Sequence, residues 1–119
     1  MLNRYVLRRD EDFKRVYKHG KSVGGRYVIV FCCRNGLDYN RMAWLASKKV
    51  GNSVRRNRAR RLMRESVRQI GEIETGYDII LIARKTINDR KCADVKKSIE
   101  TAFKKLKINK KVTADENDK

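Results

Sequence analysis

The pattern of hydrophobic and polar positions predicts helices and strands that alternate along this chain. Three apolar side chains at i, i+3 and i+4 spacing follow the acidic run at residues 10–12, which predicts a first helix that ends at Gly20. After a loop at residues 22–25, residues 26–34 are rich in β-branched and aromatic side chains and are expected to form a strand.

The next segment predicts a turn and a returning strand. The dipeptide Asn35–Gly36 favours a tight turn. Residues 41–48 are therefore expected to form a second strand that pairs with the first as a hairpin. Upstream of the first helix, residues 5–7 could add a short edge strand or remain an extended arm.

The second half of the chain predicts a long helix, a strand and a final helix. Asn52 or Ser53 is expected to cap a helix that runs to about Ile70. Residues 77–83 are uniformly apolar, which is typical of a strand buried on both faces. Residues 93–106 have core-facing side chains at helical spacing.

This element order predicts a single α+β domain, an α-β-β-α-β-α sandwich with one possible extra strand and one mixed sheet packed by helices. The domain is expected to span residues 1–108, followed by a polar and disordered tail at residues 109–119. The strand–helix–strand unit favours parallel pairing of residues 41–48 with residues 77–83, and pattern alone assigns this crossover a right hand.

The segment from Lys48 to Arg68 is strongly basic, with nine Lys or Arg residues and one acid, Glu65. At 100° per residue, one side of the predicted helix carries the residues Ala59, Leu62, Met63, Ser66, Val67 and Ile70. The opposite side carries Asn57, Arg60, Arg61, Arg64 and Arg68, with Arg58 at its edge. Arg55 and Arg56 lie over the apolar side, but in the first turn.

These arginines are unfavourable for the helix itself, because positive charge near a helix N-terminus opposes the macrodipole. A helix face that is merely solvated usually carries acidic partners at i,i+4, and this face lacks them. A counter-charge from outside the chain is therefore expected. A phosphate backbone is the obvious source, although a solvated basic face is the alternative.

Composition narrows the class of partner. Thirty-one Lys and Arg residues against 14 acids give a formal charge of +17 over 119 residues, which attracts polyanions. No apolar stretch has the length of a membrane span or a signal peptide, so no membrane partner is predicted and a cytoplasmic protein is expected. The three cysteines lack the spacing of metal ligands and are read as buried small hydrophobic residues.

The sequence predicts no catalytic residues and no metal site in this chain. It lacks a nucleophile–base set, a Gly-rich phosphate loop and clustered carboxylates. The arginines and aromatic residues of the sequence are typical of an RNA-binding protein, since arginine binds phosphates and exposed aromatic rings stack on unpaired bases. Phe13, Tyr17 and Tyr27 are candidates for such stacking, with plain core packing as the alternative.

Three segments carry a resemblance to one family. Residues 47–65, SKKVGNSVRRNRARRLMRE, closely resemble the signature helix of the bacterial ribonuclease P protein subunit. Residues 12–22, DFKRVYKHGKS, resemble the first helix and turn of that family, and residues 77–85, YDIILIARK, resemble its last strand. The resemblance covers about residues 3–107 with the element order intact.

The resemblance implies a ribonucleoprotein in which the catalytic RNA subunit holds Mg²⁺ and cleaves the 5′ leader from precursor tRNA. It implies no cofactor bound by the chain alone, no obligate protein partner, and a ribosomal protein S5 domain 2-like fold with a left-handed β-α-β crossover. The expected contacts to the RNA subunit are Arg55, Arg56, Asn57, Arg58, Arg60, Arg61, Arg64 and Arg68. The expected contacts to the leader are Phe13, Tyr17, Tyr27, Ser47, Lys48, Arg84 and Lys85.

Two other functions remain open from the residues alone. A structural ribosomal protein would share the size, the charge and the lack of catalytic groups, but precursor tRNA cleavage would not depend on it. A nuclease that acts without RNA would need acidic metal ligands close together in the fold.

Overall fold

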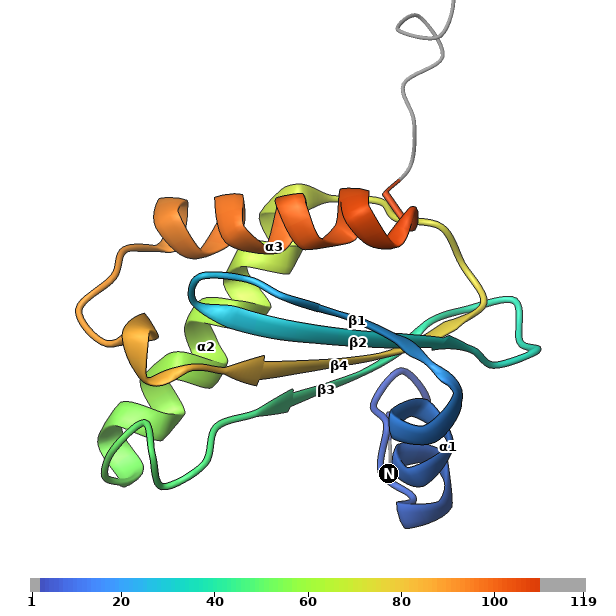
Figure 1. Ribbon diagram of the computed structural model, residues 1–119, viewed down its shortest axis with the longest axis horizontal. Coiled ribbons are helices and arrows are strands. Elements are labelled where there is room, and N and C mark those ends of the chain that lie inside the picture. The colour runs from blue at the N-terminus through green and yellow to red at the C-terminus, as the bar shows by residue number, and fades with distance from the viewer. Residues whose placement is uncertain (1–2, 110–119) are drawn as a thin grey trace, which may run out of the picture.

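The computed structural model describes residues 3–109, which form a four-stranded sheet with helices on both of its faces (Figure 1). The elements in chain order are α1 (Asp10–His19), β1 (Lys21–Gly24), β2 (Val28–Arg34), β3 (Arg41–Leu45), α2 (Ser53–Ile70), β4 (Tyr77–Ala83), the 3₁₀ helix η1 (Lys85–Ile87) and α3 (Cys92–Leu106). The predicted α+β class and all three predicted helices are confirmed.

The strand order in the sheet is β1-β2-β4-β3. β4 lies at the centre, antiparallel to β2 and parallel to β3, as the predicted pairing of residues 41–48 with residues 77–83 requires. Its side chains are buried on both faces of the sheet. In this position the β4 backbone has a hydrogen-bonding strand on each side, and its apolar side chains are covered by helices. The left-handed crossover through α2 stays an expectation from the family resemblance.

The predicted hairpin between residues 26–34 and residues 41–48 is wrong, because β4 lies between β2 and β3. The apolar β4 segment takes the central position, and the turn at Asn35–Gly36 joins two strands that are not neighbours. The second strand also ends early, at Leu45.

The hairpin that does form joins β1 to β2, with Lys21 opposite Cys32 and Gly24 opposite Ile29. Residues 22–25, expected as a loop, therefore lie mostly within a strand. β1 is a short edge strand in which Val23 alone is partly buried, so its pattern is too brief to show a period of two.

The sheet separates two hydrophobic layers. Alternate residues of β2 and β4, such as Leu81, pack with Phe103 of α3 and with α2 on one face. Ile80 and its neighbours pack with α1 on the other face. The adjacent Cys32 and Cys33 belong to different layers, as their positions on a strand predict, and all three cysteines are free thiols.

Segments outside the sheet make single bridges to it or to each other. Val6 forms a parallel bridge with Met42 of β3, so the N-terminal arm touches the free edge of the sheet without forming a full strand. Asn109 pairs with Ile73 in an antiparallel bridge. The rest of the predicted polar tail, residues 110–119, lies outside the described residues.

Candidate nucleic-acid interface

Helix α2 begins at an asparagine cap and lies against the core along one side. The side chain of Asn52 accepts a hydrogen bond from the Arg55 backbone N–H at 3.0 Å. Ala59, Met63 and Ser66 are buried, which confirms the predicted core-facing stripe. The first turn contains no acidic residue, so nothing within that turn offsets its positive charge.

The arginines of α2 differ in the partners they already have. Arg60 donates to the Asn57 side chain at 2.7 Å. Arg58 is half-buried and donates to the backbone carbonyl of Arg90, also at 2.7 Å. Arg68 is paired with Glu65. Within residues 3–109, Arg68 is the only one of the seven helix arginines with an acidic partner, and four have guanidinium groups without an ion pair or hydrogen bond: Arg55, Arg56, Arg61 and Arg64.

Glu65 neutralises one end of this basic surface. Hydrogen bonds from Arg68 and Gln69 lower the pKa of its carboxyl group to about 2. The carboxylate is therefore ionised at any physiological pH and keeps Arg68 engaged. Among the predicted RNA contacts on the helix, Arg68 is thus the one that already has a counter-charge.

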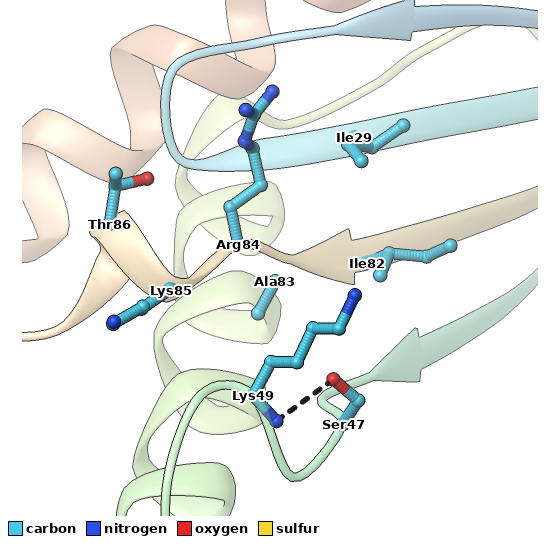
Figure 2. Close-up of a pocket in the computed structure, with 8 residues that line it drawn as sticks. All are labelled: Ile29, Ser47, Lys49, Ile82, Ala83, Arg84, Lys85 and Thr86. Atoms are coloured by element: carbon cyan, nitrogen blue, oxygen red, sulfur yellow. Dashed lines mark hydrogen bonds between the residues drawn. The ribbon is translucent and has the colours of Figure 1, made fainter.

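A groove of about 830 Å³ lies over the open part of the sheet, beside β3 and β4 (Figure 2). We refer to it as the sheet groove. Its floor includes Ile29 and Ile82, a cross-strand pair on the face that α1 also covers. The residues that line it are Ile29, Ser47, Lys49, Ile82, Ala83, Arg84, Lys85 and Thr86.

The sheet groove brings together three of the predicted leader contacts, Ser47, Arg84 and Lys85. Lys48 is exposed but does not line it, and Lys49 does so instead. In Figure 2, Lys49 extends toward Ile82, above the floor. The Ser47 hydroxyl accepts a hydrogen bond from the Lys49 backbone N–H at 3.3 Å, which bends the chain after β3.

Sequence reasoning missed Lys49 because strand alternation does not continue to this point. β3 ends at Leu45, and the side chains that follow belong to a loop whose directions have no fixed period. The run of two lysines was the available signal. The conformation of the loop places Lys49, and not Lys48, in the lining of the sheet groove.

Two of the predicted aromatic contacts lie on the same face of the sheet as the groove. Tyr17 of α1 contacts Phe31 edge to face, with ring centroids 5.0 Å apart, and Phe13 lies 6.4 Å from Tyr17. Phe13 is partly buried against the core, whereas Tyr17 is 44% exposed. Partial burial raises the pKa of the Tyr17 hydroxyl, so the ring stays neutral and available for stacking.

Tyr27 is separated from these aromatic residues. It packs against the hydrophobic layer shared with α2 and α3, on the opposite side of the sheet from Phe13 and Tyr17. The guanidinium of Arg90 lies 5.7 Å from its ring centroid. The structure therefore does not place the three predicted aromatics on one platform.

A buried carboxylate, which the sequence did not single out, fixes the position of α1. Asp78 of β4 is fully buried and accepts hydrogen bonds from Arg41 at 2.7 and 2.8 Å and from Asn35 at 3.0 Å. Arg15 of α1 also pairs with it. Burial opposes the charge, but the hydrogen bonds from Arg41, Asn35 and Arg15 outweigh it and hold the pKa of Asp78 below its usual range.

The described residues contain neither a metal-binding cluster nor a membrane-spanning helix. Across residues 3–109, no group of three or more His, Cys, Asp or Glu side chains could hold a metal ion. In the same part of the chain, none of the helices combines the length and apolar character needed to cross a membrane.

Comparison with known proteins places this geometry in one family. The family model described as Ribonuclease P matches residues 1–107. The ribonuclease P protein component of Clostridioides difficile is 44% identical over 105 residues, which is 87% of this chain and 92% of that protein. The corresponding protein of Caldanaerobacter subterraneus is 41% identical over 103 residues, covering 86% and 89% of the two chains.

Solved structures agree with the sequence relatives. The ribonuclease P protein of Staphylococcus aureus superimposes with a TM-score of 0.80 at 34% identity, over 91% of this chain and all of that one. The Thermotoga maritima protein gives a TM-score of 0.73 at 33% identity, over 82% of this chain and 94% of that one. Long sequence matches and the shared fold lead to the same conclusion: this chain belongs to the ribonuclease P protein family.

Proposed function

We propose that this chain is the protein subunit of ribonuclease P, a ribonucleoprotein that removes the 5′ leader of precursor tRNA. In this proposal α2 binds the catalytic RNA subunit, and the sheet groove with Phe13 and Tyr17 binds the single-stranded leader. The observation that carries it is the row of α2 arginines without acidic partners, since such a row needs a polyanion to neutralise it.

The layout of the fold supports two RNA partners at once. α2 packs on one face of the sheet, while the groove floor at Ile29 and Ile82 belongs to the other face. A strand of RNA in the groove would therefore not compete with RNA bound along α2. A leader in the groove would meet cations from Lys49, Arg84 and Lys85 above an apolar floor.

The chemistry of cleavage is proposed to reside in the RNA subunit, which would also hold the Mg²⁺ ions. The described residues offer no cluster of carboxylates or imidazoles that suits a divalent cation. Asp12 of α1 and Asp78 of β4 share the partners Arg15 and Arg41, so both carboxylates are engaged in ion pairs. The part of this chain is thus to bind and position RNA.

The double substitution Arg61→Ala with Arg64→Ala tests the role of α2. Both side chains are exposed and free of acidic partners, whereas Arg58 is left intact because it holds the Arg90 carbonyl. We expect the affinity for ribonuclease P RNA to fall on the order of tenfold. The slope of log affinity against log salt should become shallower by about 1.5–2, because two phosphate contacts are lost.

The matched control removes two lysines from α3, Lys96→Ala with Lys104→Ala. It changes the net charge equally but leaves α2 untouched. Circular dichroism should show both variants folded. Equal affinity of the α2 variant and the control would contradict the proposal, because the effect would then follow net charge alone.

A further inference from the structure

A second groove, of about 530 Å³, lies between the β1–β2 turn and α3. Its volume is within the range of about 300–1,000 Å³ that is common for ligand sites. We refer to it as the α3 groove. The residues that line it are Gly24, Gly25, Arg26, Tyr27, Asp94, Lys97, Ser98, Thr101 and Lys105.

The charges in the α3 groove are predominantly positive and unpaired. Arg26, Lys97 and Lys105 form no ion pair with an acid in the described part of the chain. The single lining acid, Asp94, accepts a hydrogen bond from the Lys91 backbone N–H at 3.3 Å as part of a capping box at the start of α3. Its carboxylate thus serves the helix end, and the groove keeps an excess of cations.

The groove has a built wall as well as charge. The backbone N–H of Tyr27 donates to the Ser98 hydroxyl, and Gly25 lies so close to α3 that a Cβ atom there would be 2.8 Å from that hydroxyl oxygen. The guanidinium of Arg90 lies 5.7 Å from the Tyr27 ring centroid, which places a further cation beside a residue that lines the groove. The turn is therefore held against α3, with cations on both sides of the opening.

The α3 groove adjoins the arginine helix. Arg58 of α2 donates to the carbonyl of Arg90, the residue whose guanidinium lies over Tyr27. Figure 1 shows the β1–β2 turn, the start of α2 and the start of α3 at the same end of the molecule. By contrast, Arg84 of the sheet groove reaches the other side of the turn, where it donates to the Gly25 carbonyl at 3.3 Å.

We propose that the α3 groove is a second contact site for the RNA subunit, and that it binds the phosphodiester backbone of an RNA strand that continues past α2. The inference rests on the proposed function of α2. Lys97 and Lys105 would act as point charges on phosphates of the same strand, about two helical turns apart, and Arg26 as a guanidinium fork. Because the site lies on the α2 side of the sheet, the catalytic RNA reaches it rather than the leader.

The test is the double charge reversal Lys97→Glu with Lys105→Glu, compared with Lys96→Glu plus Lys104→Glu, two lysines of the same helix that do not line the groove. Both variants change the net charge by the same amount, so a difference reports position. We expect the groove variant to bind ribonuclease P RNA on the order of tenfold more weakly than the control. Its salt slope should also be shallower by about 1.5–2.

A second measurement identifies the RNA. Once each variant is saturated with RNA subunit, affinity for precursor tRNA with a leader and for mature tRNA should equal that of the unchanged protein. The inference is overturned if the groove variant and the control bind the RNA subunit equally, or if the loss appears only with leader-bearing tRNA.

The outcome is separable from that of the proposed function. If Arg61→Ala with Arg64→Ala weakens RNA binding and Lys97→Glu with Lys105→Glu does not, α2 keeps its role and only the α3 groove is refuted. If the α2 variant has no effect, the proposed function itself fails. Circular dichroism of both charge-reversal variants excludes loss of fold as the cause of weaker binding. Tyr27→Leu perturbs the same groove and leaves the net charge unchanged.

Discussion

Asp78 shows how one residue connects the core to the proposed leader site. The carboxylate is buried near the start of the central strand β4 and binds side chains from α1, β3 and the segment after β2. Arg15, on the same helix as Phe13 and Tyr17, is one of those partners. The aromatic side chains therefore depend for their position on a charge that they do not touch.

Replacing Asp78 with Asn should destabilise the fold by about 3 kcal/mol, because it removes the buried counter-charge of Arg15 and Arg41 and leaves them only the longer contacts with Asp12 at 3.4 and 3.5 Å. Urea unfolding measures the change, and Asp38→Asn in the exposed loop after β2 serves as a control with little expected effect. The folded-state pKa of Asp78 is lowered, so its contribution is complete above about pH 4 and is lost as pH falls through the folded value.

The difference in stability between the unchanged protein and Asp78→Asn should accordingly shrink below about pH 4. A difference that stays constant down to pH 2 would show that the charge of Asp78 is not what stabilises the fold. Equal stability of the two proteins at pH 7 would show that Asp78 does not stabilise the fold.

Tyr17 carries the most exposed ring of the proposed leader site. Tyr17→Ala should weaken binding of leader-bearing precursor tRNA to the holoenzyme by about 1–3 kcal/mol, the usual value for one stacked base. Tyr17→Phe keeps the ring and its contact with Phe31 and should bind almost normally. Equal losses for precursor and mature tRNA would argue against a role in leader binding.

The residues that sequence reasoning placed best are those within regular elements. The burial of Met63 and the exposure of Arg61 and Arg64 follow from the 100° repeat of a helix. Lys49 and Tyr27 lie in a loop and at a turn, where no repeat determines direction. Their positions depend on how β3, β4 and α3 pack together, which the local sequence pattern does not determine.

At the scale of elements, α2 combines an unfavourable charge pattern with strong anchoring. The Asn52 cap satisfies one backbone N–H of the first turn, and the buried stripe through Ala59, Met63 and Ser66 fastens the helix to the core. These contacts stabilise a helix whose arginines oppose its own dipole. The fold therefore does not depend on the exposed arginines of α2, and these side chains are available to bind a partner.

The strands illustrate where local patterns are insufficient. The uniform apolar run at residues 77–83 predicted both its own strand and its burial on two faces. The turn signal at Asn35–Gly36 is also real, but it does not decide which strands become neighbours. The central place of β4 decides this, and that place depends on contacts between residues more than thirty positions apart.

At the scale of the whole molecule, the sheet divides the surface into two regions. The arginines of α2 and the α3 groove belong to the side covered by α2 and α3, and the sheet groove with Tyr17 belongs to the side of α1. In the proposed function, a formal charge of +17 would attract RNA to both sides. Two separate surfaces would allow the protein to bind a catalytic RNA and its substrate at the same time.

The most direct test of this account is cleavage of 5′-labelled precursor tRNA at low Mg²⁺ by the chain alone, by a bacterial ribonuclease P RNA alone, and by both together. We predict cleavage at the mature 5′ end only in the mixture, with the RNA alone active in a high-Mg²⁺ control. Cleavage by the chain alone would contradict the account, and so would a mixture no more active than the RNA alone.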